Sequence, residues 1–146
     1  MLSTEDLDRG IISLKLFGVR LADEGKYKCL FKSTENMYSV HLLVGAASSP
    51  VITLEDVNSS GLVLACQAKG WYPQPKLSWW NADGLPLPAV PMTTTQDPDR
   101  LYNIFSTVEV EWESLSRPLV CRVHQELFNQ TRETEIHLPG RSCVVW

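Results

Sequence analysis

CQAKGWYPQPKLSWW, residues 66–80, joins two short alternating segments through a loop that contains two prolines. Before the loop, in residues 62–68, every second residue is apolar. After the loop, in residues 76–80, apolar residues again occupy every second position. Such a period of two is typical of β-strands with one buried face. Trp79 follows Cys66 by thirteen residues, and Cys121 lies further along the chain.

One tryptophan spaced in this way between two cysteines is the signature of an immunoglobulin domain. We therefore expect a Cys66–Cys121 disulfide with Trp79 packed against it in the core. A disulfide would mean that the protein folds in an oxidising compartment, and so is secreted or displayed on a cell surface. Sequons at Asn58 and Asn129 agree with that compartment and mark two candidate glycosylation sites.

Three further segments alternate in the same manner, and each has one apolar and one polar face. Strands that recur at these short intervals predict an all-β immunoglobulin-like sandwich. Leu119 occupies the position two before Cys121 where many immunoglobulin domains have tyrosine, so we expect no tyrosine corner in this sandwich. The segments are residues 102–110, 119–124 and 133–138.

The segments between these strands are expected to be irregular. Residues 70–75 cannot be regular sheet, because both prolines lack a donor and restrict the residue before them. The sequence does not decide whether the peptide bond before Pro73 is cis or trans. Residues 84–88 and 93–99 are predicted turn or edge segments.

Composition excludes several classes of protein. The 146 residues are 44% hydrophobic and 21% charged, with a net charge of -4, so no basic surface is available for nucleic acid. The longest apolar run, residues 42–47, is far shorter than the roughly 20 residues of a membrane helix. The first ten residues lack the features of a secretory signal peptide.

The first 45 residues contain only three alternating segments: residues 12–16, 23–29 and 40–44. In the second, Asp23, Gly25, Tyr27 and Cys29 stand at intervals of two, which predicts a tyrosine corner with the Tyr27 hydroxyl bonded back to the backbone. A cysteine at this place should pair with an earlier one, and none precedes Cys29. We expect the C-terminal part of a variable-type domain whose first half is missing, so that Cys29 is half of a disulfide with its partner absent.

These motifs together resemble the butyrophilin family and related T-cell co-signalling ligands, with a first part similar to the variable domain of myelin oligodendrocyte glycoprotein. The resemblance rests on VRLADEGKYKC at residues 19–29, and on GWYPQP at residues 70–75 followed by SWW at residues 78–80. It implies a partial variable-type domain over residues 1–45, a linker at 46–49, a complete constant-type domain at 50–139 and an irregular tail at 140–146.

The resemblance also implies a function. Members of the family are type I membrane glycoproteins on the external side of the plasma membrane, some with an intracellular SPRY domain. This chain would then bind a protein receptor on T cells and regulate T-cell activation and cytokine production. The resemblance is compatible with a homodimer and with a heterodimer that contains a related family member. The alternatives are a truncated soluble isoform or fragment without receptor activity, and a homophilic adhesion protein of the myelin or junctional type.

No enzyme, cofactor or metal is expected. His41, His124 and His137 fall on predicted outward strand positions, and no GxSxG, HExxH or calcium-loop motif occurs. Cys29 and Cys143 could bond intermolecularly, pair with each other, or be unpaired through truncation, and we favour truncation.

Three aromatic residues are candidate contacts with a partner. Trp80, on the outward face of its segment, is either a sheet-surface aromatic or a contact residue. Trp71 and Tyr72 either brace the proline loop or form an exposed aromatic anchor, since such residues are enriched at interfaces.

Overall fold

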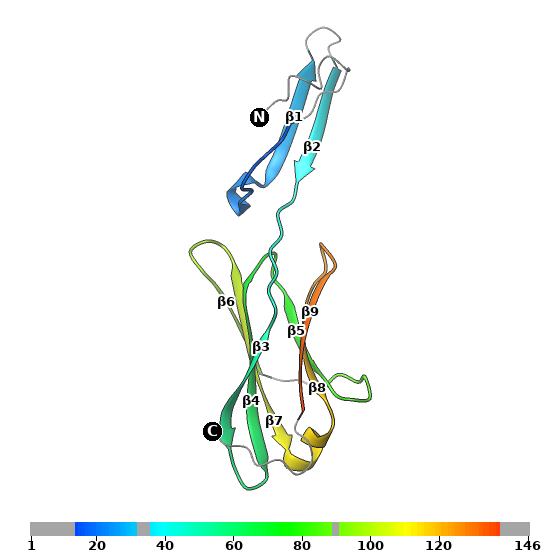
Figure 1. Cartoon of the computed structure of the whole chain (residues 1–146). Coiled ribbons are helices and arrows are strands. Elements are labelled where there is room, and N and C mark those ends of the chain that lie inside the picture. The colour runs from blue at the N-terminus through cyan, green and yellow to red at the C-terminus, as the bar shows by residue number, and fades with distance from the viewer. Residues whose placement is uncertain (1–13, 32–35, 89–90, 138–146) are drawn as a thin grey trace. The chain divides into compact units, whose positions relative to one another are not determined.

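The computed structural model describes residues 14–31, 36–88 and 91–137. Every element named within them is a strand or a short 3-10 helix, which confirms the all-β prediction. The chain divides into two compact units, Met1–Val44 and Gly45–Trp146. They are called unit 1 and unit 2 below and are described separately (Figure 1).

Unit 1 contains a two-stranded antiparallel sheet. The short 3-10 helix η1 (Leu21–Asp23) leads into β1 (Gly25–Phe31), which pairs with β2 (Asn36–Leu42). The register sets Cys29 opposite Tyr38. A sheet of two strands alone is marginally stable in water.

The three segments predicted in unit 1 agree with these strands in part. The second overlaps η1 and β1, and the third overlaps the end of β2. Of the first, Leu14 to Leu16 belong to no named strand, and residues 12–13 lie outside the described residues. Within the described residues this segment has a single bridge residue, Leu14, whereas β1 and β2 pair with each other along their full length.

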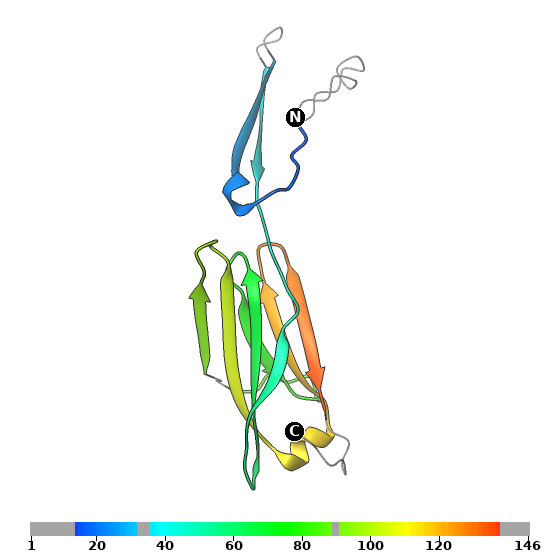
Figure 2. The same cartoon turned by 60° about the vertical axis from the view of Figure 1, so that its left-hand side comes forward.

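Unit 2 is a sandwich of one four-stranded and one three-stranded antiparallel sheet (Figure 2). The orders β3-β4-β7-β6 and β5-β8-β9 are those of a constant-type immunoglobulin domain. The strands are β3 (Val51–Val57), β4 (Gly61–Trp71), β5 (Lys76–Trp80), β6 (Met92–Gln96), β7 (Tyr102–Glu111), β8 (Leu119–Gln125) and β9 (Gln130–Ile136).

The core lies between the two sheets. Along β5, β7 and β8 buried residues alternate with more exposed ones, on the faces that the sequence predicted. The short 3-10 helix η2 (Trp112–Ser116) adds Leu115, which is 1% exposed. The buried cluster consists of Leu62, Leu64, Cys66, Ala68, Trp71, Leu77, Trp79, Ile104, Val108, Leu115, Leu119, Cys121 and Val123.

β4 extends further than predicted. Gly70 and Trp71, assigned to the irregular connection, belong to this strand, and Trp71 pairs with Tyr102 after a register shift that begins at Ala68. The prediction was wrong at these two residues because the first proline stands two positions beyond Trp71 and does not interrupt the ladder before it. The Tyr72–Pro73 peptide is cis, the option that the sequence left open.

The two outer strands of the larger sheet were the hardest to see in the sequence. β6 overlaps the predicted turn or edge segment 93–99, begins one residue before it, and pairs with β7 alone. All five of its residues are exposed, so no apolar period marks it. β3 pairs with β4 alone at the opposite edge.

Residues 45–50, which include the predicted linker, are hydrogen-bonded to the rest of unit 2. The backbones of Ala46 and Tyr72 exchange two hydrogen bonds, of 3.0 and 2.9 Å. The Ser48 hydroxyl donates to the carbonyl oxygen of Lys69 at 2.5 Å. The small residues of the predicted linker thus lie close to the backbone of residues 69–72.

Both ends of residues 45–50 are also held. A Cβ added to Gly45 would lie 2.8 Å from the ring of Phe128, so only glycine fits there without a shift. At the other end Pro50 is buried, and its carbonyl oxygen accepts a hydrogen bond of 2.6 Å from the Thr134 hydroxyl. β9 is thereby tied to the chain that enters β3.

Candidate protein-interaction surface

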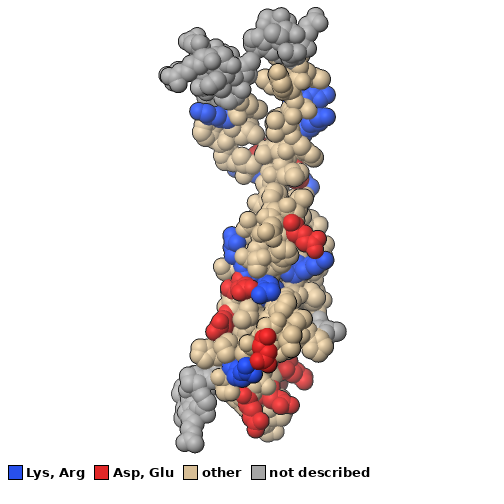
Figure 3. All heavy atoms as spheres, turned by 90° about the vertical axis from the view of Figure 1, so that its right-hand side faces the viewer, with Lys and Arg blue, Asp and Glu red and all other residues tan. Residues whose placement is uncertain are grey.

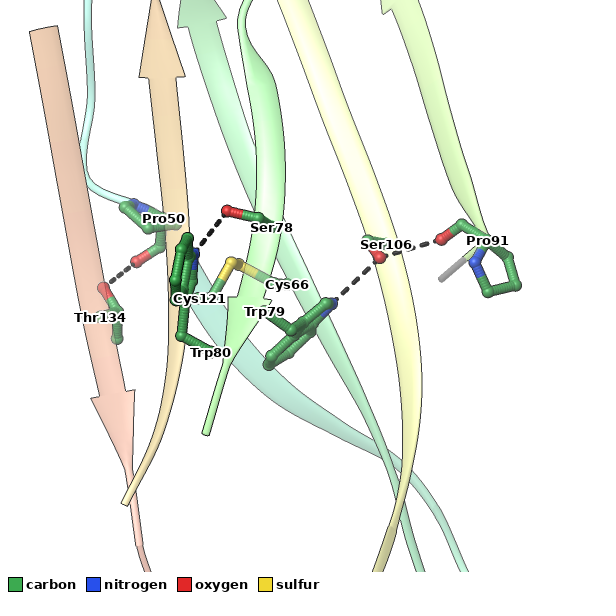
Figure 4. Close-up of a disulfide and its surroundings, with 9 residues drawn as sticks. All are labelled: Pro50, Cys66, Ser78, Trp79, Trp80, Pro91, Ser106, Cys121 and Thr134. Carbon is green, nitrogen blue, oxygen red and sulfur yellow. Dashed lines mark hydrogen bonds between the residues drawn. A yellow bond between two sulfur atoms is a disulfide. The ribbon is translucent and has the colours of Figure 1, made fainter. Parts of the chain in front are cut away.

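The predicted disulfide joins Cys66 of β4 to Cys121 of β8 inside the sandwich (Figure 4). Both cysteines are fully buried, and Trp79 beside them is 1% exposed. Trp79 Nε1 donates to Ser106 Oγ at 3.1 Å, and this hydroxyl donates in turn to the carbonyl oxygen of Pro91 at 2.9 Å. These groups link the two sheets and offer no surface to a partner.

The outer face of the smaller sheet carries the other tryptophan of β5. Trp80 points away from the core, and its Nε1 donates to Ser78 Oγ at 2.7 Å (Figure 4). The guanidinium carbon of Arg122 lies 4.2 Å from the centroid of the Trp80 ring. Arg122 Nε also donates to Glu133 Oε1. A cation–π contact and an ion pair therefore hold the arginine over the indole.

Strand register brings these side chains together. Ser78 lies opposite Arg122 in the β5–β8 pair, and Arg122 lies opposite Glu133 in the β8–β9 pair. Trp80 lies opposite Val120, next along the same face. Side chains opposite or diagonal across strands are close enough to interact. We call Ser78, Trp80, Val120, Arg122 and Glu133 the Trp80 surface.

A hollow that is open to solvent includes part of the Trp80 surface. Its walls combine aromatic and small apolar groups with two carboxylates, which suits a protein contact better than a small polar substrate. It is lined by Trp80, Asn81, Ala82, Gly84, Pro118, Val120, Arg122, Glu133 and Glu135.

Charges of both signs are interspersed over the face of unit 2 shown in Figure 3. Lys76 and Glu126 are 3.7 Å apart, and Arg117 and Asp83 are 2.7 Å apart. The hydrogen bond and the negative charge of Asp83 raise the pKa of Arg117 above its usual value. Exposed pairs of this kind contribute little to stability but leave no field of a single sign to attract a polyanion.

The histidines do not form a site. His41 and His137 are exposed, and the half-buried His124 ring contacts the Thr131 hydroxyl through Nδ1 at 2.8 Å. In the described part of the chain, no group of three or more His, Cys, Asp and Glu is placed to hold a metal ion. The same residues include no helix that is long and apolar enough to cross a bilayer.

Of the two aromatic residues in the proline loop, only Tyr72 reaches the surface. Trp71 is 0% exposed, so its interpretation as an exposed anchor is wrong: it completes the core at the end of β4. Its Nε1 has no hydrogen-bond partner among the described residues. Tyr72 is half-buried, its ring stacks on Tyr102 at 6.3 Å between centroids, and Arg100 lies over the same ring.

In unit 1 the predicted corner residues lie close together. The Tyr27 hydroxyl donates to the carbonyl oxygen of Asp23 at 2.5 Å, as in a tyrosine corner, and Gly25 adopts a φ of 155° that glycine tolerates. Cys29 is exposed with a free thiol. Cys143 lies outside the described residues.

The sheet face that carries Cys29 is apolar and open to solvent. Tyr38 and Val40 are each 66% exposed, and the register sets them opposite Cys29 and Tyr27. The described strands of unit 1 therefore leave this apolar face uncovered.

Arg122 and Ser106 were not singled out from the sequence, although a signal existed for each. Neighbouring residues of a strand point to opposite faces of the sheet. Because Cys121 was expected to face the core with Trp79, the next residue, Arg122, should lie on the outer face with Trp80. Ser106 is a small polar residue at an inward position of an otherwise apolar strand, a sign that some buried donor needs an acceptor.

Comparisons with known proteins agree with this geometry. Residues 46–133, more than half of the chain, match the family model described as "Butyrophilin subfamily 3 member A2-like, Ig-C domain". Mouse "Selection and upkeep of intraepithelial T-cells protein 2" is 32% identical over 93% of this chain, and human "Butyrophilin subfamily 1 member A1" is 27% identical over 94%. The chain spans about a third of the mouse protein (34%) and about a quarter of the human one (27%).

Solved structures give the same result. Bovine butyrophilin matches with a TM-score of 0.64 at 29% identity, covering 83% of this chain and 58% of its own. A chain in the crystal structure of ICOS in complex with ICOS-L and an anti ICOS-L VNAR domain matches with a TM-score of 0.62 at 26% identity, covering 92% of this chain and 68% of its own. By its fold, its disulfide framework and these matches, the chain belongs to the butyrophilin-like family of immunoglobulin proteins.

Proposed function

We propose that this chain is part of a cell-surface ligand that binds a protein receptor on T cells and regulates T-cell activation and cytokine production. The observation that carries the proposal is the Trp80 surface, a rigid aromatic and arginine pair on the outer face of a butyrophilin-like domain. Tryptophan and arginine, with tyrosine, are enriched among the residues that contribute most of the binding energy at protein interfaces.

The names of the relatives support the same role. The mouse proteins are named for selection and upkeep of intraepithelial T-cells, and one structural neighbour comes from a complex of ICOS with ICOS-L. A pre-formed surface binds with a smaller ordering cost than a flexible one, and both Trp80 and Arg122 are already held by neighbours.

We also infer the domain roles from the sequence motifs. Residues 1–45 are the C-terminal part of a variable-type domain, and residues 50–139 are a constant-type domain. The disulfide partner of Cys29 would be a cysteine in the remaining strands of the variable-type domain. The full-length protein is membrane-anchored on the external side of the plasma membrane, and pairing with itself or with a related member is compatible with this arrangement.

Binding to T cells tests the proposal. The chain, secreted from mammalian cells and assembled into fluorescent tetramers, is expected to stain primary T cells and to change cytokine release when coated beside a T-cell receptor agonist. Trp80→Ala and Arg122→Ala are each expected to reduce staining about tenfold or more, the loss typical of a central contact residue.

Met92→Ala is the matched control, because Met92 is an apolar residue 52% exposed on β6 of the other sheet. It should leave staining unchanged. Absence of staining by the correctly folded chain would refute the proposal. Self-association of the chain on cells that lack T-cell receptors, without staining of T cells, would favour homophilic adhesion instead.

A further inference from the structure

An exposed tryptophan lies at the opposite end of β7 from the proline loop. Trp112 opens η2 and is 39% exposed. Its Nε1 donates to the carbonyl oxygen of Asn58 at 3.2 Å, and its backbone N–H donates to the carbonyl oxygen of Ser60 at 3.4 Å. The indole is thus fixed beside the turn between β3 and β4, with much of its ring in water.

That turn carries a sequon, Asn58-Ser59-Ser60. The Asn58 side chain caps the turn: its Oδ1 accepts hydrogen bonds from Ser60 N at 2.9 Å, Ser60 Oγ at 2.7 Å and Gly61 N at 2.9 Å. All three bonds use the oxygen. Nδ2, the atom to which an N-linked glycan is attached, has no hydrogen-bond partner among the described residues, and Asn58 is exposed.

We propose that Asn58 carries an N-linked glycan and that the first N-acetylglucosamine of this glycan packs on the Trp112 ring. In the transfer, Nδ2 forms a bond to C1 of the sugar on a lipid-linked oligosaccharide donor, and the bond between C1 and the diphosphate oxygen breaks. The lipid diphosphate leaves with the electron pair, and one amide proton passes to a base of the transferase.

The hydrogen bonds of the folded turn are compatible with this product. Substitution on Nδ2 leaves Oδ1 free to keep its three hydrogen bonds, so the cap of the turn survives. The C–H groups on one face of a pyranose are apolar, and contact with an indole removes apolar surface of both partners from water. The glycan therefore covers the part of Trp112 that the protein leaves open.

The second sequon supplies an internal comparison. Asn129 is exposed in the turn between β8 and β9, with a φ of 50° that asparagine tolerates. The hydroxyl of its sequon threonine, Thr131, contacts His124. The neighbouring ring of Phe128 lies against Gly45 rather than standing free. Among the described residues, no tryptophan is hydrogen-bonded to the turn that carries Asn129.

The test begins with site occupancy. The full chain is secreted from mammalian cells that make high-mannose glycans, behind a signal peptide that is removed on export, and its glycopeptides are sequenced by mass spectrometry. Asn58 is expected to be occupied. An unoccupied Asn58 in the secreted, folded protein would overturn the proposal.

Contact with Trp112 is tested by a double-mutant cycle after endoglycosidase H has trimmed each glycan to one N-acetylglucosamine. Ser60→Ala removes the sequon and the Ser60 Oγ bond to Asn58 Oδ1, but it keeps the two bonds that Asn58 Oδ1 accepts from backbone N–H groups. The lost hydroxyl bond is the same in every background, and the variant is expected to lower Tm by about 2–5 °C. In a Trp112→Leu background the same change should lower Tm by less than about 1 °C. Asn129→Asp, which removes the other sequon, should shift Tm equally in both backgrounds.

Nuclear Overhauser effects in the trimmed protein give an answer that does not depend on any variant. Cross-peaks between sugar C–H protons and Trp112 ring protons are expected. Their absence, or an equal effect of Ser60→Ala in both backgrounds, would show that the sugar does not rest on the indole.

Discussion

Trp79 of the smaller sheet donates its indole N–H to the hydroxyl of Ser106 of the larger sheet, across the centre of the sandwich. The hydroxyl is used twice, because it also donates to the carbonyl oxygen of Pro91 beside β6 (Figure 4). A buried polar chain of this kind is stabilising only while every member is satisfied. Trp71 provides the contrast, since its buried indole N–H has no such partner among the described residues.

Trp79→Phe and Trp71→Phe should therefore differ. Both leave a cavity, and Trp79→Phe also leaves Ser106 without its donor, so we expect it to lower the free energy of unfolding by about 2–4 kcal/mol. Trp71→Phe should cost about 1 kcal/mol less, because it removes no hydrogen bond. Urea denaturation followed by circular dichroism measures both. Equal losses would contradict the role given to Ser106.

The two classes of cysteine should respond differently to removal. The double variant Cys66→Ala, Cys121→Ala opens a loop with a sequence separation of 55 residues. It is expected to lose about 4 kcal/mol, enough to unfold a marginal domain. Cys29→Ala should change stability little, because its thiol is exposed and unbonded. Thermal unfolding of the unchanged chain and of the two variants measures these differences. A loss of stability in Cys29→Ala comparable to that of the double variant would contradict the assignment of Cys29 as unbonded.

Glycine is required at position 61 because the backbone of Val110 lies too close for a side chain, and not because of the backbone angles of Gly61. A Cβ at this buried position would lie 2.0 Å from the carbonyl oxygen of Val110 on the paired strand. We expect Gly61→Ala to lower the free energy of unfolding by about 2–4 kcal/mol. Gly84→Ala is the control: it has open space but a φ of 75°, and should cost about 1–2 kcal/mol. Chemical denaturation that ranks the two in the reverse order would refute the argument.

The stacked pair on the Trp80 surface should be energetically coupled. Arg122→Ala alone is expected to cost about 0.5–1 kcal/mol, since the contact is partly exposed. In a cycle with Trp80→Ala the two losses should be less than additive, because each single change already removes the same contact. Strict additivity in denaturation experiments would mean that the stacking contributes nothing.

Much of unit 2 could be predicted because its central strands have one buried face. The alternation around Cys66, Trp79 and Cys121 supplied the inward residues, and the spacing of these three predicted the disulfide that the structure contains. The edges were harder. β6 is exposed at every residue, and Trp71 joined β4 through pairing with Tyr102, which is a property of the partner strand and not of the local sequence.

The candidate surface could be predicted only in outline. Alternation placed Trp80 on the outer face, but its contact with Arg122 depends on the register between β5 and β8, which no local pattern reveals. Trp112 gave no signal either. Its relation to Asn58 spans 54 positions of the chain and arises only when the turn after β3 meets the end of β7.

The way in which residues 45–50 are held has a consequence for chain length. Gly45 lies against Phe128 and Ala46 is paired with Tyr72, so the register with which the chain enters β3 is already set at residue 46. A residue inserted before Gly45 leaves these contacts intact, whereas one inserted between Ala46 and Pro50 must break a contact or displace β3. Insertions and deletions among related proteins are therefore expected to collect ahead of this glycine and to be rare in the five positions after it.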